Sequence, residues 1–344
     1  MTRRSLSLAV LGGVVLLLLV LAPTAFFVIF AGLLLAAGLT GAGDWIARRA
    51  GIGRGWAIAL LLLGILVAIV ILFFLFAPAV ATQIDELSRT LPDAVDSLRA
   101  KVAGYGWLDR LIATLQPSSA LPDGTGAVAV GAFSSVLGAA ANVLIALIIG
   151  IYGALSPGIY RRGLLALLAP SLRPSGDEVA RAVIRVLQRW LGAQLVSMTV
   201  VGVLTTIGLW LVGVPLALLL GLIAGLLGFV PNIGPIIAAV PALLLASTLG
   251  GSEVLMTAGI FLVVQGLESY LITPQIQQET VSLPPALLLA AQLTLGLIYG
   301  LAGLLLAGPL TAVAMTLTNA LYRRGYLETE PRNPPETALQ RRMD

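Results

Sequence analysis

Long apolar runs without charge are the feature that most constrains this chain. Residues 6–22 contain no charged side chain, and neither does the longer stretch 55–84. A helix rises about 1.5 Å per residue, so about 20 apolar residues cross the hydrocarbon core of a bilayer. Strands of a membrane barrel would alternate polar and apolar residues, and these runs do not. The runs therefore predict an all-α polytopic membrane protein.

About eight apolar segments follow one another along the chain. We place them at residues 6–22, 24–42, 55–80, 128–155, 191–213, 215–249, 254–273 and 284–322. The first run could serve as a signal peptide, but a second run follows after only Pro23, which favours a retained hairpin. The segments 215–249 and 284–322 are too long for one crossing and contain glycine and proline. Each is expected to fold as a hairpin of two half-helices.

Composition removes several classes of function. Of the residues, 58% are hydrophobic and 10% charged, against about 25% charged in an ordinary soluble domain. The chain has neither cysteine nor histidine, which excludes thiolate sites and a Ser/His or HExxH intramembrane protease. No aspartate pair lies within the spans for an aspartyl protease, and no GxxxxGK[ST] motif is present for ATP-driven transport. We expect a protein that is not an enzyme and takes no cofactor.

Arginines set the expected orientation, because cytoplasmic loops of membrane proteins are enriched in Lys and Arg. They gather at both ends of the chain and in the loops 43–54 and 157–190, whereas the segment 81–127 is acidic. This pattern predicts a bacterial inner-membrane protein with both termini in the cytoplasm. The net charge of +4 belongs to these loops, so membrane lipids are expected as partners and nucleic acid is not.

The same features divide the chain into seven parts. They are N-terminal spans at 1–80, an extracytoplasmic amphipathic segment at 81–127, a span at 128–156, a cytoplasmic interfacial helix segment at 157–190, repeat units at 191–253 and 254–322, and a disordered tail at 323–344. Within the interfacial segment, Val179, Val183, Val186 and Trp190 form a stripe opposite three arginines. Such a stripe predicts a helix on the lipid surface.

The C-terminal half contains a predicted inverted repeat. In each unit a helix leads into a long apolar stretch that carries a Gly-Pro pair, Gly234-Pro235 in the first and Gly308-Pro309 in the second. One helix plus one hairpin makes an odd number of crossings, so consecutive units are expected to have opposite orientations. Gly/Pro-broken helices line the solute site of many secondary transporters. Simple kinks between packed helices are the alternative.

Polar residues inside these spans form the candidate site. Glu268 lies in a stretch of chain without Lys or Arg, where ionisation is costly, so it suits a group that exchanges a proton or cation. The alternative is that it reaches interfacial water near Pro274. Gln265 precedes it on the same helix face. Around Asn232, the motif Pro231–Pro235 frees backbone carbonyls at membrane depth. Gln194 and Gln292 are weaker candidates.

The order and spacing of five segments resemble the autoinducer-2 exporter family, and the resemblance covers residues 1–322. The segments are LGAQL, VGVPLALLLGLIAGLLGFVPNIGPIIAAVPALLLA, QGLESYLITPQIQ, VSLPPALLL and GLAGLLLAGPLTAV. The resemblance implies a homo-oligomeric secondary transporter; some members are described as exporters of a furanone-derived signal, and others are similar to Na+(Li+)/H+ antiporters. It points to Pro231, Gly234, Pro235, Gln265, Glu268 and Pro274. The family usually has an aromatic residue where Asn232 stands, so the substrate is expected to differ.

Together these observations predict a secondary transporter. It would export a small polar solute, such as an autoinducer-2-like signal or a related metabolite, by alternating access at the broken helices. The alternatives are a Na+(Li+)/H+ antiporter and, from another class, a non-transporting membrane scaffold. The predicted substrate- or ion-binding residues are Pro231, Asn232, Gly234, Pro235, Gln265, Glu268, Pro274, Gly308 and Pro309.

Overall fold

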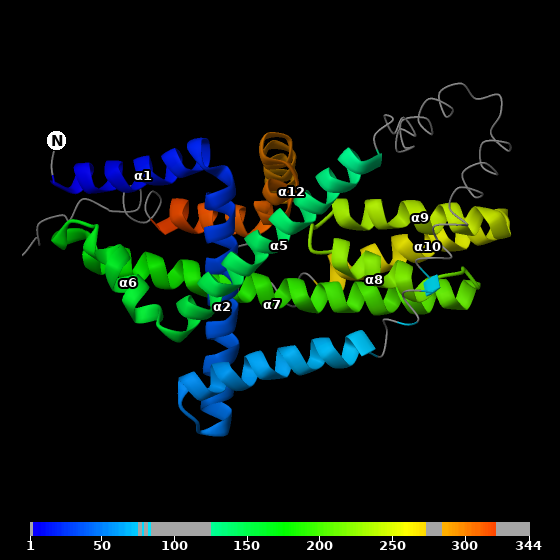
Figure 1. Cartoon of the computed structure of the whole chain (residues 1–344), viewed down its shortest axis with the longest axis horizontal. Helices are drawn as coiled ribbons and strands as arrows, with labels where there is room; N and C mark the ends of the chain where they lie inside the picture. Colours follow the sequence, from blue (N-terminus) through cyan, green and yellow to red (C-terminus); the bar gives the residue numbers. More distant parts are fainter. Residues whose placement is uncertain (1–2, 75–77, 79–81, 84–124, 273–283, 321–344) are drawn as a thin grey trace, which may run out of the picture.

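The computed structural model describes residues 3–74, 78, 82–83, 125–272 and 284–320 (Figure 1). Most of the predicted segment 81–127, Pro274 and the tail 323–344 lie outside these residues. Regular structure within the described residues is helical. The helices are α1 (Arg3–Leu21), α2 (Pro23–Ala50), a helix at Arg54–Phe74, α5 (Thr125–Leu155), α6 (Pro157–Ala166), α7 (Arg173–Val212), α8 (Ala217–Leu227), α9 (Ile233–Leu249), α10 (Gly251–Leu267) and α12 (Pro285–Leu317).

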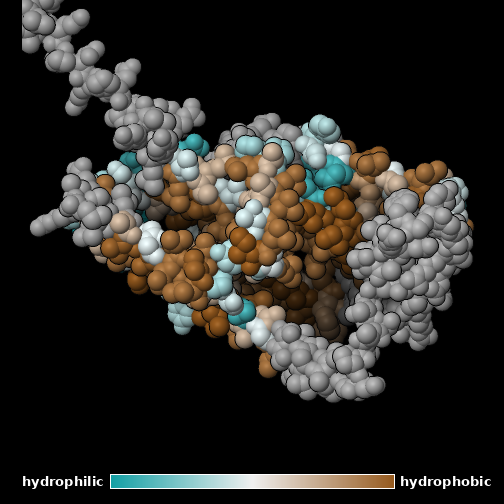
Figure 2. Space-filling view, turned by 90° about the horizontal axis from the view of Figure 1, so that it is seen from above, coloured by the Kyte–Doolittle hydropathy of each residue, from teal (hydrophilic) through white to brown (hydrophobic). Residues whose placement is uncertain are grey.

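Six helices within the described ranges are long and apolar enough to cross a membrane. They are Pro23–Ala50, Arg54–Phe74, Leu137–Leu155, Pro170–Val212, Gly251–Tyr270 and Pro285–Ala320. The segment 215–249 consists of two shorter helices, α8 and α9, in agreement with the expected two half-helices. Large apolar side chains cover the outer surface, which Figure 2 shows as mostly hydrophobic. The prediction of an all-α polytopic membrane protein is confirmed.

Prolines and glycines set the ends of these helices. Pro23, Pro157 and Pro285 each occupy a first-turn position, where the missing N–H has no helical partner to lose. Gly51 follows α2 and Gly213 follows α7 in the left-handed conformation, with φ of 65° and 80°, which suits glycine because it has no Cβ.

Helix α7 is the longest element and contacts most of the others. Its 40 residues extend for about 60 Å at 1.5 Å per residue, which exceeds the hydrocarbon thickness of a bilayer. The helix α2 crosses it, and α8 and α10 lie along its C-terminal half (Figure 1). No proline occurs between Pro174 and Pro215. The helix therefore continues without interruption through residue 190, where the predicted interfacial segment 157–190 ends.

The apolar stripe of that segment packs against other helices, and the interfacial position of the segment stays a prediction. Trp190 is buried, and Val183 and Val186 are partly buried, in a cluster with α2 and the second half of α12. Phe30 and Leu306 are among their partners in this cluster. The apolar stripe therefore packs against protein. The expectation that both termini lie in the cytoplasm stays a prediction.

Glycine allows α7 and α8 to approach at the level of their backbones. A Cβ on Gly225 would lie 2.8 Å from the carbonyl oxygen of Met198 and 3.1 Å from the Cα of Gly202. On Gly221, one turn earlier, it would overlap the Thr206 hydroxyl. Small residues at membrane helix interfaces permit such close packing, which supplies van der Waals contact where lipid is as apolar as the side chains. This contact positions α8 and the turn that follows it.

Candidate functional site

A tight reversal of the chain separates α8 from α9. Asn232, the residue before α9, has φ of 67° and an exposed side chain. The N–H of Gly234 donates to the carbonyl of Val230 at 2.9 Å. A Cβ on Gly234 would overlap the carbonyl of Leu227, so glycine is required for the two half-helices to meet here. The motif predicted to break the first long stretch does so, and we call residues 228–232 break 1.

Two glutamine amides donate to carbonyls of break 1, and the Pro231 carbonyl also accepts from the N–H of Ile233 at 2.8 Å. Gln194 of α7 donates from Nε2 to the carbonyl oxygen of Gly228 at 2.6 Å, and Gln292 of α12 donates to that of Pro231 at 2.9 Å. Both glutamine side chains are buried. Freed carbonyls in an apolar interior are costly unless paired. The two residues that sequence reasoning ranked as weaker candidates therefore hold the break in place.

Replacing Gln194 with leucine should destabilise the protein by about 1–3 kcal/mol, because the buried Gly228 carbonyl loses its side-chain donor. Thermal unfolding in detergent micelles measures the loss. The matched control is Thr199→Val on the same helix, since Thr199 is exposed and bonds only to Leu195 of its own helix. Equal stability of the two variants would contradict the assignment.

A second break lies within α12, at Gly300. This residue has φ of 64° and ψ of −146°, and the two halves of the helix run in different directions on either side of it (Figure 1). Gly308-Pro309, the pair predicted to mark this break, lies inside the second half instead. Pro309 is fully buried there, and Gly308 contacts the ring of Trp190. The physical reason is that Gly300 takes a backbone conformation open almost only to glycine.

The two breaks share a local pattern. LGFVPN at residues 227–232 corresponds to LGLIYG at 295–300. In each, the positive-φ residue is the fifth after a leucine, and the carbonyl of that leucine contacts a later glycine, Gly234 or Gly303. The two breaks share this spacing and a positive φ but differ in ψ, which is −43° at Asn232 and −146° at Gly300; the shared spacing supports the idea of related units. The inverted orientation of the units stays a prediction.

Replacing Gly300 with alanine should cost about 1–3 kcal/mol, because alanine pays the strain of this backbone region. No atom lies within 4 Å of a Cβ built there, so the cost is conformational rather than steric. Gly296→Ala is the control, since its Cβ would make ordinary contact with Leu304 at 3.6 Å. Thermal unfolding should separate the pair, and an unchanged Gly300 variant would contradict the assigned conformation.

The carboxylate of Glu268 lies at the end of α10, next to α7. Ser197 of α7 donates a hydrogen bond to its Oε1, and Gln265 donates from Nε2 to its Oε2 at 3.3 Å. Gln265 also approaches the hydroxyl of Ser269 at 3.4 Å. Glu268 is half-buried, and no ion pair reaches it within the described residues. The carboxylate is thus held by neutral donors, which leaves its charge uncompensated.

The turn of α7 that carries Gln194 and Ser197 joins this carboxylate to break 1. The two residues are three positions apart, on one face of the helix. Gln194 binds the break and Ser197 binds Glu268. Ser197 was not predicted, and its only signal in the sequence is its spacing from Gln194 within an apolar helix.

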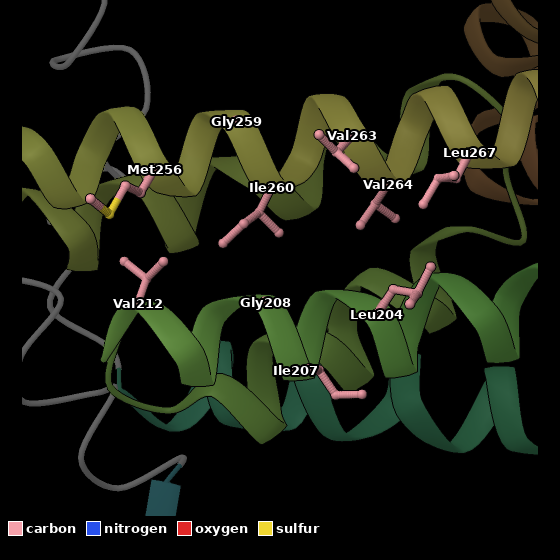
Figure 3. Close-up of a pocket in the computed structure, with 10 residues that line it drawn as sticks. All are labelled: Leu204, Ile207, Gly208, Val212, Met256, Gly259, Ile260, Val263, Val264 and Leu267. Carbon is pink, nitrogen blue, oxygen red and sulfur yellow. The ribbon is translucent and has the colours of Figure 1, made fainter.

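A separate groove lies between α7 and α10 and has a volume of about 470 Å³ (Figure 3). Its lining includes Leu204, Val212, Ile260 and Leu267, and every lining residue is apolar or glycine. Figure 3 shows side chains of the two helices facing each other across it. With no polar side chain, the groove has no group that recognises an ion or polar solute, although it ends one residue from Glu268.

Comparison with known protein families gives a match over nearly the whole chain. The sequence pattern of the AI-2E family transporters matches residues 6–323. The chain belongs to the AI-2E transporter family. The predicted resemblance is therefore confirmed, and the protein is a multi-pass membrane protein of a transporter family.

Three relatives have the words "transport protein" in their names. YrrI of Bacillus subtilis is 35% identical over 143 residues, which are 42% of this chain and 40% of YrrI. A protein of Thermotoga maritima is 31% identical over 143 residues, 41% of this chain and 44% of that protein. MT0215 of Mycobacterium tuberculosis is 29% identical over 295 residues, which are 81% of this chain and 78% of MT0215. The matches with the first two thus span less than half of each relative.

In this AI-2E family member, the predicted site residues fall into three groups. Glu268 and Gln265 form the carboxylate cluster. Pro231, Asn232, Gly234 and Pro235 build break 1 and the start of α9. Gly308 and Pro309 lie in the second half of α12. Gly308 contacts the ring of Trp190, which in turn meets the ring of Phe229 of break 1 with centroids 5.7 Å apart.

Proposed function

We propose that this AI-2E transporter is a secondary transporter that exports a small solute by alternating access at break 1, with Glu268 as the site of a coupling proton or cation. The observation that carries the proposal is the shared turn of α7, from which Gln194 binds the break and Ser197 binds the carboxylate. A change in the protonation or ion binding of Glu268 would therefore alter the position of this turn of α7 and, through Gln194, that of break 1. Na+(Li+)/H+ antiport is the second candidate, favoured by an acid in a membrane span that has no basic partner among the described residues.

A scaffold and a transporter differ in whether water reaches break 1 from one side of the membrane. The chain has no cysteine, so a single Asn232→Cys substitution reports alone. A membrane-impermeant maleimide should label it in vesicles of one orientation and not the other, and acidification or added cation should change that rate. Leu262→Cys, on the exposed face of α10, is the control and should stay unlabelled.

Absence of labelling at Asn232→Cys from both sides, with the protein folded, would overturn the transport proposal and favour a scaffold. Labelling that ignores pH and cations would remove the coupling role of Glu268 while leaving uncoupled export.

Two partners complete the proposal. Lipid would cover the apolar outer surface, and copies of the same chain would cover part of it. The helix Arg54–Phe74 exposes about half or more of Leu63, Leu66 and Ile69, at 56%, 57% and 58%. A homo-oligomer would bury such a face, and chemical cross-linking in native membranes tests for it.

A further inference from the structure

A second cavity lies between α2, α5 and α12, and none of the polar side chains around Glu268 lines it. Its volume is about 520 Å³, within the range of about 300–1,000 Å³ of small-molecule sites. None of the described residues that line it is charged. Burying an ion among such walls would leave its charge uncompensated, which costs several kcal/mol or more. The cavity therefore suits an uncharged molecule.

The walls are aromatic and touch both breaks. Phe27 of α2 and Tyr299 of α12 meet with ring centroids 5.2 Å apart and planes at 62°. Tyr299 immediately precedes Gly300, the second break, and Phe229 of break 1 also lines the cavity. A molecule in the cavity, against the outer faces of these rings, contacts the turning point of each hairpin. Its binding then depends on the positions that the two hairpins take.

Asn142 supplies the polar feature of this cavity. It lies half-buried inside the apolar span Leu137–Leu155 of α5, and no hydrogen bond to its amide occurs within the described residues. Asparagine side chains in membrane spans normally bond across to another helix, because an unpaired amide in hydrocarbon is costly. The side chains of Thr24 and Tyr299 add hydroxyl groups to the lining. The lining thus combines an apolar body with a few hydrogen-bonding groups.

We propose that this cavity binds an uncharged organic small molecule whose apolar ring or chain lies against Phe27 and Tyr299 and whose polar group bonds to Asn142. That this molecule is the exported solute rests on the proposed function, whereas its binding in the cavity does not. A lipid acyl chain would fill the space but leave the Asn142 amide unpaired. The apolar groove between α7 and α10 has no such amide, and it is the place where an acyl chain fits.

The test uses the full-length protein in lipid nanodiscs and a diazirine-bearing benzyl alcohol, a neutral aromatic probe with one hydroxyl. Photolabelling should saturate, map by mass spectrometry to α5 and α12, and be displaced by excess benzyl alcohol. Asn142→Leu should raise the probe concentration that gives half-maximal labelling about threefold to tenfold, which is the effect of losing one neutral hydrogen bond. Leucine has a similar size and suits the span, so this variant should fold.

Val143→Trp and Leu144→Trp form a matched pair on α5. Val143 lines the cavity and Leu144 does not, although both are more than half exposed. Tryptophan at Val143 should abolish saturable labelling, and tryptophan at Leu144 should leave it unchanged. Size-exclusion profiles confirm that each variant is folded.

Two results would overturn the proposal. One is labelling that does not saturate and spreads evenly over the exposed helix faces. The other is labelling of the same peptides by a photoreactive phosphatidylcholine that benzyl alcohol fails to displace, which would make lipid the occupant. Photolabelling requires no transport and should persist in Glu268→Gln. Failure of the maleimide experiment at Asn232 would therefore leave this site standing, and failure of photolabelling would leave the transport proposal standing.

Discussion

Replacing Glu268 with glutamine is expected to reduce cation-dependent proton movement to the level of empty vesicles. Glutamine has nearly the same size and still accepts a hydrogen bond from Ser197, but its amide neither takes up nor releases a proton near neutral pH. The measurement uses proteoliposomes that contain a pH-sensitive dye, with Na+, Li+ and K+ added in turn. A tenfold lower rate would correspond to a barrier about 1.4 kcal/mol higher. Complete loss of flux, by contrast, is the result expected when the proton-binding group itself is removed.

The control for this experiment is Glu253→Gln. Glu253 lies at the start of α10 and accepts a hydrogen bond from Ser252 at 2.8 Å, far along the helix from Glu268. Its replacement should leave the flux intact. Equal flux in wild type and in Glu268→Gln would show that the coupling site lies elsewhere. No flux from the wild type with any of the three cations would remove the antiporter candidate and leave solute export.

Replacing Gly225 with leucine is expected to prevent α7 and α8 from packing. The first side-chain atom already meets the carbonyl of Met198 at 2.8 Å, and backbone cannot move aside as a flexible side chain can. Overpacking usually costs about 1–3 kcal/mol, and here the forced separation also breaks the bond from Gln194 to Gly228. We therefore expect a loss of at least about 4 kcal/mol, which is exceptional for one substitution.

The yield of monodisperse protein and its thermal unfolding measure this effect. Gly192→Leu is the matched control on α7, since no atom lies within 4 Å of a Cβ at that exposed position. It should be neutral or slightly stabilising, because leucine favours the helix by about 0.5–1 kcal/mol over glycine. Similar behaviour of the two variants would mean that the close approach of α7 and α8 is not needed for folding.

The sequence predicts the first break better than the second, for a physical reason. Two prolines and a glycine within Pro231–Pro235 leave little choice but a break. In the second stretch the same reasoning points to Gly308-Pro309, yet a proline can stay in a helix whose neighbours fill the space around it. The actual break uses Gly300, which has no neighbouring proline to single it out among the 38 glycines of the chain, and its likeness to break 1 is recognised only once break 1 is known.

The carboxylate site is predicted in part. Glu268 and Gln265 are visible because an acid is rare in a span and a glutamine precedes it by one turn. Ser197 is not, since its role depends on how α7 and α10 meet, and helical periodicity says nothing about that. The stripe ending at Trp190 shows the same limit: an apolar stripe does not reveal whether lipid or protein covers it.

The unbroken length of α7 has a mechanical consequence. Gln194 and Ser197 share one turn of a helix that is unbroken from Arg173 to Val212 and whose proline, Pro174, lies in the first turn, so neither can shift along the axis without the other. Because α10 and the α8–α9 hairpin both bond to the same turn of α7, a displacement of one relative to α7 also changes its position relative to the other. The N-terminal end of α7 extends about 30 Å before Gln194, so a rotation of this helix would move α10 and the α8–α9 hairpin together.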